Sequence, residues 1–267
     1  MGKIIKVLWP AVIAAILTAG AAWRAEASVV TKDVEYRDAD VTLQGYLAYD
    51  DSMPGKIPGV VIVHAWKGLG SYEKMRAEQL AKLGYAAFCA DIYGKGIRPA
   101  DNTAAAKEAG IYRANRKLLR RRAEAALNEL KKQEMVDTGR LAAIGYCFGG
   151  GTVLELARDG ADIAGVVSFH GNLDTLNPAD AKNIKAKVLV CHGANDPYTS
   201  AEQLQAFMKE MRDAKTDWQM DIYGNAVHGF TMPDSGGNTS AGMAYNEKAD
   251  RRSWEAMKAF FDELFVK

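Results

Sequence analysis

Cys147 stands in a stretch whose residue types and spacing indicate nucleophilic chemistry. The apolar run Leu141–Ile144 has the length of a strand, Gly-Tyr-Cys-Phe-Gly follows it, and a helix-like segment comes next. A nucleophile on such a strand–turn–helix needs small neighbours, and Gly145 and Gly149 supply them. The unpaired amides and macrodipole at a helix N-terminus also favour a thiolate. The alternative is that Cys147 is a buried small hydrophobe, as most free cysteines are.

Two further polar residues follow strand-like runs. Asp196 comes after the apolar run that ends at Cys191, and His228 comes after the last such run. Ligand sites of parallel sheets lie beyond the carboxyl ends of the strands, so these side chains are expected to meet Cys147 there. His228 would take the thiol proton and later protonate the leaving group, while Asp196 would orient the imidazole. Otherwise Asp196 would cap the next helix and His228 would be a turn residue.

Acyl transfer also needs two backbone donors for the oxyanion. One is the amide of Phe148, the residue after the nucleophile. The other is expected in the loop after the third strand, where Ala65 and Trp66 lie, and Trp66 is the candidate.

These segments resemble the dienelactone hydrolase (carboxymethylenebutenolidase) family of α/β-hydrolases. The resemblance covers residues 30–265 and rests on Gly-Tyr-Cys-Phe-Gly-Gly at 145–150, His-Gly-x-x-Asp at 192–196, His-Gly-Phe at 228–230 and Asp-Ile-Tyr-Gly at 91–94. It implies the three-layer α/β-hydrolase fold with a mostly parallel eight-stranded sheet. It also implies a catalytic triad of Cys147, His228 and Asp196, hydrolysis of esters or lactones through an acyl-thioester, and no cofactor.

Two features depart from the type enzyme of that family. There, a glutamate after the third strand pairs with the resting cysteine, whereas residues 64–69 here include no carboxylate. We therefore expect Cys147 to rest as a thiolate paired with protonated His228. The arginines that hold the dienelactone carboxylate lack clear counterparts, although Lys95 can replace one of them. The candidate substrate-binding residues are Lys95, Tyr93 and Phe230.

The other histidines and cysteines are read as structural. Each of the remaining histidines ends an apolar strand, where hydrogen bonding within the sheet end is expected rather than metal binding: His64, His170 and His192. Cys89 and Cys191 lie in apolar runs and are expected to be buried free thiols. No pair or cluster has zinc-ligand spacing, so no metal site is predicted.

Charge and composition point to a small-molecule partner. The 267 residues include 34 basic and 33 acidic side chains, which gives no argument for a nucleic-acid partner. Six of the basic residues form a stretch between 113 and 122, which is interpreted as a solvated helix face. The sequence predicts no oligomeric state.

Residues 1–27 read as a secretory signal peptide. Lys3 and Lys6 precede an apolar run from Val7 to Trp23, and Ala25-Glu26-Ala27 supplies a cleavage site. We expect cleavage after Ala27, a periplasmic or secreted mature chain, and no stable membrane anchor afterwards. The alternative is an uncleaved membrane anchor.

Residues 28–267 are expected to form a single domain. An antiparallel hairpin at 29–49 precedes strands that alternate with helices, which is typical of an α/β fold with a mostly parallel sheet. A long polar, alanine-rich stretch is expected to lead into a helix at 114–133. The loop at 232–245 is either a lid or a floppy connection.

We therefore expect an exported hydrolase that cleaves small carboxylic esters or lactones through a cysteine acyl-enzyme. A thioesterase or peptidase on the same fold is one alternative, because a thiolate can also attack thioesters and amides. A non-catalytic binding protein that keeps the fold is the other.

Overall fold

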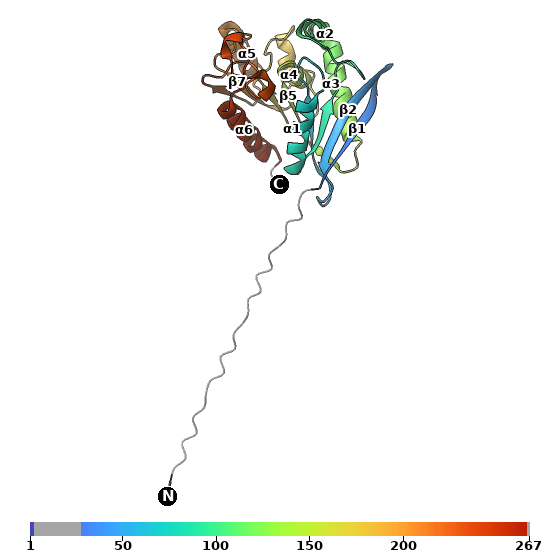
Figure 1. Cartoon of the computed structure of the whole chain (residues 1–267), viewed down its shortest axis with the longest axis vertical. Coiled ribbons are helices and arrows are strands. Elements are labelled where there is room, and N and C mark those ends of the chain that lie inside the picture. Colours follow the sequence, from blue (N-terminus) through green and yellow to red (C-terminus); the bar gives the residue numbers. More distant parts are fainter. Residues whose placement is uncertain (3–27, 266–267) are drawn as a thin grey trace.

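A twisted eight-stranded sheet forms the centre of the protein in this computed structural model, which describes residues 1–2 and 28–265 (Figure 1). Its strands lie in the order β1-β2-β4-β3-β5-β6-β7-β8. The pairs β1–β2 and β2–β4 are antiparallel, and the other neighbours are parallel. The strands are β1 Val29–Asp38, β2 Val41–Asp50, β3 Ile57–Val63, β4 Ala86–Ala90, β5 Val136–Tyr146, β6 Gly165–Phe169, β7 Lys187–Gly193 and β8 Trp218–Tyr223. The predicted sheet and its N-terminal hairpin are confirmed.

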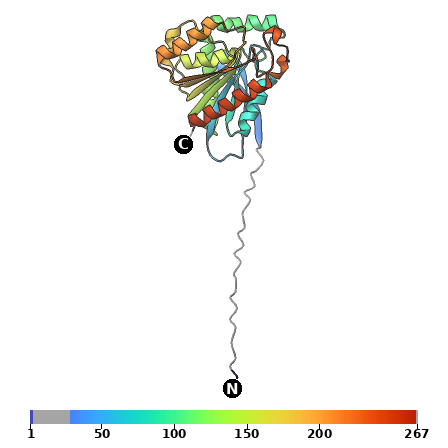
Figure 2. The ribbon, with the colours of Figure 1, turned by 90° about the vertical axis from the view of Figure 1, so that its left-hand side faces the viewer.

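Helices cover both faces of this sheet (Figure 2). Helices α1 and α6 pack on one face, and α3, α4 and α5 pack on the other. The helices are α1 Ser71–Lys82, α2 Asn102–Ala114, α3 Arg116–Lys131, α4 Phe148–Arg158, α5 Ala201–Ala214 and α6 Glu247–Phe265, with short 3₁₀ turns η1 Pro178–Asn183, η2 Pro233–Ser235 and η3 Thr239–Ala241. The molecule therefore has three layers and one hydrophobic core on each side of the sheet.

The packing of strand β3 on both of its faces explains why its sequence is apolar throughout. Successive side chains of a strand point to opposite faces. Val61 and Val63 accordingly pack in the core under α3 and α4, while Val60 and Ile62 pack in the core under α1 and α6. All four side chains are fully buried. A strand covered on both faces needs an unbroken apolar run rather than an alternating one.

The alanine-rich stretch after β4 contains a helix that the sequence reading did not assign. Asp101 caps α2 by accepting a hydrogen bond from the Ala104 amide at 2.8 Å. Asn115 ends that helix and caps α3 through the Leu118 amide at 3.0 Å. The predicted helix at 114–133 is therefore α3, and α2 lies before it, above the carboxyl ends of the strands (Figure 1).

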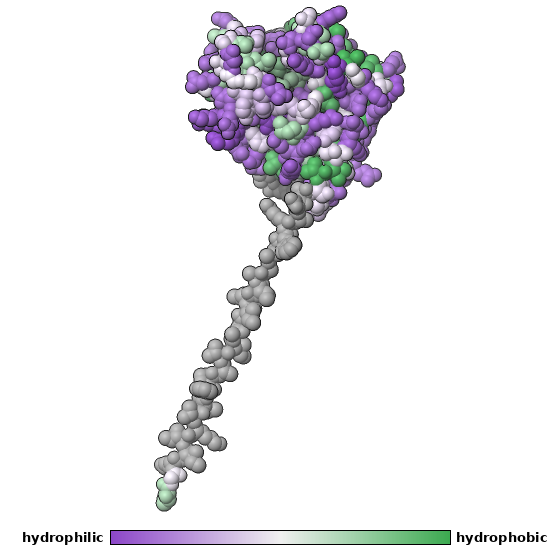
Figure 3. All heavy atoms as spheres, viewed as in Figure 1, coloured by the Kyte–Doolittle hydropathy of each residue, from purple (hydrophilic) through white to green (hydrophobic). Residues whose placement is uncertain are grey.

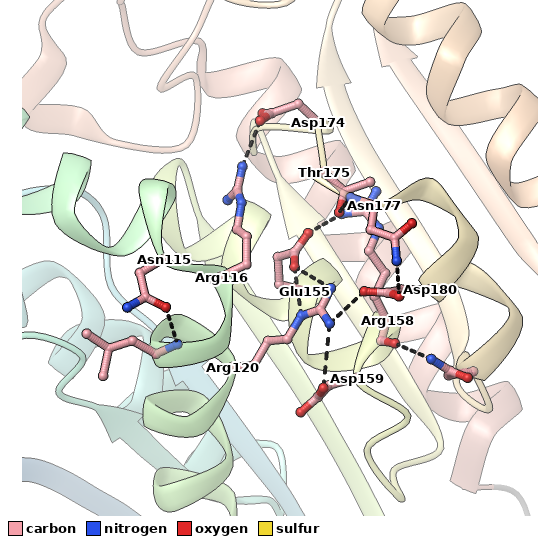
Figure 4. Close-up of polar contacts among 12 residues, drawn as sticks. Asn115, Arg116, Arg120, Glu155, Arg158, Asp159, Asp174, Thr175, Asn177 and Asp180 are labelled. Atoms are coloured by element: carbon pink, nitrogen blue, oxygen red, sulfur yellow. Dashed lines mark hydrogen bonds and ion pairs between the residues drawn. The ribbon is translucent and has the colours of Figure 1, made fainter.

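The expected solvated face of α3 is wrong for several of its arginines, which make buried or half-buried ion pairs. Arg120 contacts Glu155 and Asp180, each at 2.8 Å, and Arg116 contacts Asp174 at 2.7 Å (Figure 4). Periodicity showed a charged helix face, but the carboxylates that cover it come from segments distant in sequence.

Polar side chains cover most of the surface in the view of Figure 1, with small apolar patches between them (Figure 3). Among the residues described, no helix combines the length and apolar character required to cross a bilayer. The expected signal peptide falls almost wholly on residues 3–27, outside the described residues.

Candidate active site

Cys147 sits on a sharp turn between β5 and α4. Its backbone φ of 55° and ψ of −113° lie where side-chain-bearing residues are strained. A Cβ at position 145 would lie 2.1 Å from the Gly149 carbonyl oxygen, and one at position 149 would lie 2.1 Å from the Val63 carbonyl oxygen. The two glycines therefore let strand, turn and helix pass at backbone contact, as the sequence pattern required.

The Cys147 side chain is 8% exposed, and it lines a cavity of about 330 Å³. Burial alone would indicate a structural thiol in the hydrophobic core. Because it opens on this cavity, a small molecule can reach it. By contrast, Cys89 and Cys191 are fully buried in the core, as expected for structural thiols, and burial raises the pKa of both.

His228 lines the same cavity, and Asp196 lies behind it. The Nδ1 atom of His228 is 2.8 Å from Oδ2 of Asp196, and both residues are buried. Asp196 does not cap α5, because Ser200 fills that place and accepts a hydrogen bond from the Gln203 amide. The other Asp196 oxygen accepts from the Tyr198 amide at 2.9 Å, which fixes the carboxylate in its turn.

Cys147 and His228 each shift the pKa of the other toward its charged form. Burial raises the pKa of the Cys147 thiol, but the charge and hydrogen bonding of His228, with a contribution from Arg113, outweigh burial and leave the pKa lowered. Burial lowers the pKa of His228, while the thiolate and Asp196 more than compensate and raise it. These opposite shifts favour a thiolate–imidazolium pair.

The two expected oxyanion donors have different surroundings. The Phe148 amide is the first N–H of α4, where helices leave donors unpaired, and it also helps to hold the thiolate. The Trp66 side chain lines the cavity, and its amide has no acceptor within the described part of the chain. The Ala65 amide is not free, because it donates to Oε1 of Glu73 at 3.1 Å. Of the two amides considered, that of Trp66 is therefore the one left available.

None of the three candidate substrate-binding residues is among the cavity-lining side chains. Lys95 is exposed and pairs with Glu35 of β1. Tyr93 is buried behind the cavity wall, where its hydroxyl donates to the Trp66 carbonyl at 2.9 Å. Phe230 is fully buried in the core. All three follow strands as predicted, but side-chain direction and packing turn them away from the cavity.

Four cavity-lining residues were missed from the sequence: Arg113, Asn172, Tyr198 and Met243. Nη2 of Arg113 donates to Oδ1 of Asn172 at 2.9 Å, and its guanidinium lies 5.9 Å from the centre of the Phe148 ring. Asn172 lies just beyond the carboxyl end of β6, so the rule that identified Asp196 and His228 also applied to it. Arg113 carried no such signal, because its helix was not assigned.

The remaining histidines are buried around the site. His64 donates from Nδ1 to the Ala65 carbonyl at 2.7 Å and accepts the Ile92 amide at Nε2, and burial lowers its pKa to about 4. The ring centres of His170 and His228 are 5.2 Å apart, and burial, with the charge of His228, lowers the pKa of His170. Burial also lowers the pKa of His192. These shifts favour the neutral form of the three imidazoles around the site.

The loop at 232–245 is not a floppy connection. It contains η2 and η3, and backbone hydrogen bonds join it to both sides of His228, from its amide to the Gly242 carbonyl and from the Ala244 amide to its carbonyl. Met243 from this loop lines the cavity. The loop thus holds His228 in place and closes one wall of the site.

Comparisons with known proteins agree with this fold. A family model described as the dienelactone hydrolase family matches residues 43–265. A solved structure called m3DLH is 42% identical with a TM-score of 0.86, covering 89% of this chain and 99% of its own. A dienelactone hydrolase-like promiscuous phosphotriesterase from metagenomic libraries is 43% identical with a TM-score of 0.85, covering 88% of this chain and 98% of its own.

Among curated proteins, a probable 2-oxo-3-(5-oxofuran-2-ylidene)propanoate lactonase of Bradyrhizobium sp. is 28% identical over 185 residues, covering 66% of this chain and 74% of the relative. The strand order and the sharp turn at Cys147 between β5 and α4 are those of the α/β-hydrolase fold. The chain belongs to the dienelactone hydrolase family and is a hydrolase of that type.

Proposed function

We propose that this hydrolase cleaves small carboxylic esters or lactones through an acyl-thioester on Cys147. One observation carries the proposal. A strained cysteine at a helix N-terminus shares a cavity with a histidine that a buried aspartate holds at 2.8 Å. Nucleophile, proton carrier and orienting carboxylate are the groups that acyl transfer needs.

The geometry supports two half-reactions. In the first, the Cys147 thiolate attacks the carbonyl carbon, the new oxyanion accepts hydrogen bonds from the Phe148 and Trp66 amides, and the carbon–oxygen bond breaks as the His228 imidazolium protonates the leaving alkoxide. In the second, neutral His228 takes a proton from water, the hydroxide attacks the thioester, and the thiolate leaves. The proton count balances, because His228 ends as the imidazolium it was at the start.

The cavity supports a small substrate with an apolar body. A volume of about 330 Å³ is at the lower end of ordinary ligand pockets. Trp66, Tyr198 and Met243 offer apolar and aromatic contact, while Arg113 and Asn172 provide the polar contacts. The lactonase name of the Bradyrhizobium relative also favours a lactone among the possible esters.

A panel of esters and lactones assayed on the mature protein tests this function. We expect turnover by the wild type, loss by at least about a thousandfold in Cys147→Ala, and a slow residual rate in Cys147→Ser, whose alcohol has a much higher pKa than a thiol. Thioester and amide analogues of the best ester separate it from a thioesterase or peptidase. Turnover that survives Cys147→Ala would overturn the cysteine mechanism.

The same panel distinguishes an enzyme from a binding protein. An ester-like electrophile should label Cys147 in the wild type and label it far more slowly in His228→Ala. A binding protein that only keeps the fold would bind the ester without releasing acid or alcohol. Equal labelling with and without the imidazole would remove the support for catalysis.

A phosphotriester is a second candidate substrate. A relative 43% identical to this chain is described as a promiscuous phosphotriesterase, and Arg113 brings a guanidinium to the cavity, where charge on a phosphoryl oxygen would develop. A neutral aryl phosphotriester therefore belongs in the panel. Failure to release its phenol would exclude this second activity and leave the first untouched.

We further propose that the mature chain begins after Ala27 and works in the periplasm or outside the cell. The support is the basic, apolar and small-residue succession of residues 1–27. Mass spectrometry of the exported protein should give Ser28 as its first residue. Recovery of the whole chain in the membrane fraction would favour the anchor instead.

A further inference from the structure

Glu73 joins both ends of the loop that carries Trp66. This residue lies in the first turn of α1 and is 2% exposed. Its Oε1 atom accepts from the Ala65 amide at 3.1 Å, and its Oε2 atom accepts from the Gly70 amide at 2.9 Å. A single carboxylate therefore closes the loop at 65–70 from behind, without being one of the side chains that line the cavity.

Burying a carboxylate is costly, and each oxygen of this one accepts a backbone hydrogen bond. Burial raises the pKa of Glu73, and the two amides, together with the charge of Arg98, only partly offset this effect. Nε of Arg98 also donates to the Leu69 carbonyl at 2.7 Å, which anchors the same loop from the outside. Hydrogen bonds to a charged acceptor are about twice as strong as neutral ones, so this carboxylate fixes the backbone more firmly than an amide side chain could.

The next peptide plane of the loop is fixed by His64. Its Nε2 accepts the Ile92 amide, so the proton must be on Nδ1, which donates to the Ala65 carbonyl at 2.7 Å. The Gly68 amide also donates to that carbonyl. In a trans peptide, the Trp66 N–H points opposite to the Ala65 carbonyl. Because the Ala65 carbonyl is held toward His64, the Trp66 N–H points away from His64 and stays free to donate.

We propose that Glu73 is a positioning residue for the oxyanion site: it holds the Ala65 and Gly70 amides on either side of the peptide that carries the Trp66 N–H, so that this N–H is kept ready to stabilise the oxyanion. The inference rests on the proposed function. Without the carboxylate, the Ala65 and Gly70 amides lose their acceptor, and the peptide that carries the donor keeps its contacts with His64 and Gly68 but loses the restraint on the loop either side of it. A reaction of Cys147 that forms no oxyanion does not depend on the two hydrogen bonds that Glu73 accepts.

The experiment compares Glu73→Gln with Glu78→Gln, which removes a charge from the same helix where the carboxylate accepts from the Tyr46 hydroxyl instead. Loss of an oxyanion donor costs about a hundredfold to a thousandfold in kcat, so loosening one should lower kcat for the best ester about tenfold in Glu73→Gln. KM should stay within about twofold, because the substrate contacts remain. Glu78→Gln should match the wild type.

Alkylation of Cys147 by iodoacetamide provides the discriminating readout, because this displacement at carbon creates no oxyanion. Its rate should be the same in wild type and Glu73→Gln. An equal fall of alkylation and turnover would mean general damage to the site and overturn the proposal, as would an unchanged kcat. If Glu73→Gln does not fold, Glu73→Asp replaces it, because the shorter carboxylate cannot reach both amides and should lower kcat in the same way.

Amide hydrogen exchange separates this inference from the proposed function. Exchange at residues 65–70 should accelerate in Glu73→Gln and not in Glu78→Gln, whether or not any ester is turned over. A wild type that cleaves no ester would sink the proposed function alone. Unchanged amide exchange at residues 65–70 would overturn only the positioning role of Glu73.

Discussion

Cys147 and His228 differ from the other cysteines and histidines in their surroundings as well as in their sequence context. Cys191 lies within the buried strand β7 and Cys147 directly follows β5; burial raises the pKa of the Cys191 thiol, whereas the pKa of the Cys147 thiol is lowered. The difference is His228, whose imidazole is held by Asp196 and whose charge and hydrogen bonding lower the pKa of the Cys147 thiol. Reactivity at this scale is therefore a property of the pair.

The alkylation rate of Cys147 should rise with pH through an inflection below about 8.5, the ordinary value for a thiol. The reason is that His228 and Arg113 lower the thiol pKa despite its burial. Iodoacetamide labelling across a pH series measures it, and His228→Ala should move the inflection upward. An inflection at or above the ordinary value would contradict the thiolate–imidazolium pair.

Arg113→Met should also raise the pH of that inflection, because it removes a positive charge that favours the thiolate. Arg113→Lys keeps the charge and is the matched control, which should stay near the wild type. Identical inflections for the two variants would show that Arg113 does not act on the thiol through its charge.

The turn at Cys147 depends on how secondary-structure elements pack, because α4 lies directly against backbone rather than against side chains. Gly149 would place a Cβ against the Val63 carbonyl of β3, and Gly145 would place one against α4 itself. Strand β5, the turn and α4 can therefore keep their spacing only with hydrogen at these positions. The strained φ of Cys147 is maintained by that packing.

Gly149→Ala should destabilise the protein by about 3 kcal/mol or more, because the clash is with backbone that cannot move aside. Gly110→Ala is the control within a helix, since a Cβ there meets nothing within 4 Å. It should be stabilising by about 0.5–1 kcal/mol, through higher helix propensity. Urea denaturation of both variants measures these values, and a tolerated Gly149→Ala would disprove the close approach.

Across the whole molecule, buried ion pairs join the helices on the α3–α5 side of the sheet. Arg158 of α4 is fully buried and contacts Glu210 of α5 at 2.8 Å and Glu155 of its own helix at 3.1 Å. Arg120 of α3 reaches Glu155 and Asp180 (Figure 4). The network fixes α3, α4 and α5 relative to one another, and α4 is the helix that follows Cys147.

Glu210→Gln should lower the free energy of unfolding by about 3 kcal/mol, because it leaves the buried Arg158 with too little compensating charge. Asp213→Asn, one turn further along α5, breaks an exposed pair with Lys209 and should change it by less than about 0.5 kcal/mol. Chemical denaturation monitored by circular dichroism compares them. Equal effects would show that burial does not govern these pairs.

The sequence alone was enough for the sheet, the nucleophile turn and the candidate triad, because each depends on local chemistry. Apolar runs specify buried strands, and the spacing of Gly145, Cys147 and Gly149 specifies a tight strand–helix turn. Chain order after strands then placed Asp196 and His228 at one end of the sheet, and the structure brings them within hydrogen-bonding distance. The roles assigned to these side chains stay predictions.

Only the tertiary structure decided which side chains line the cavity. Arg113, Asn172 and Met243 come from three separate segments, and their meeting depends on how α2 and the loop at 232–245 pack over the strand ends. The same holds for Glu73, which approaches the Trp66 loop from the following helix rather than from within the loop. Local patterns fix where the backbone turns, but the direction and burial of a side chain depend on neighbours that lie far away in the sequence.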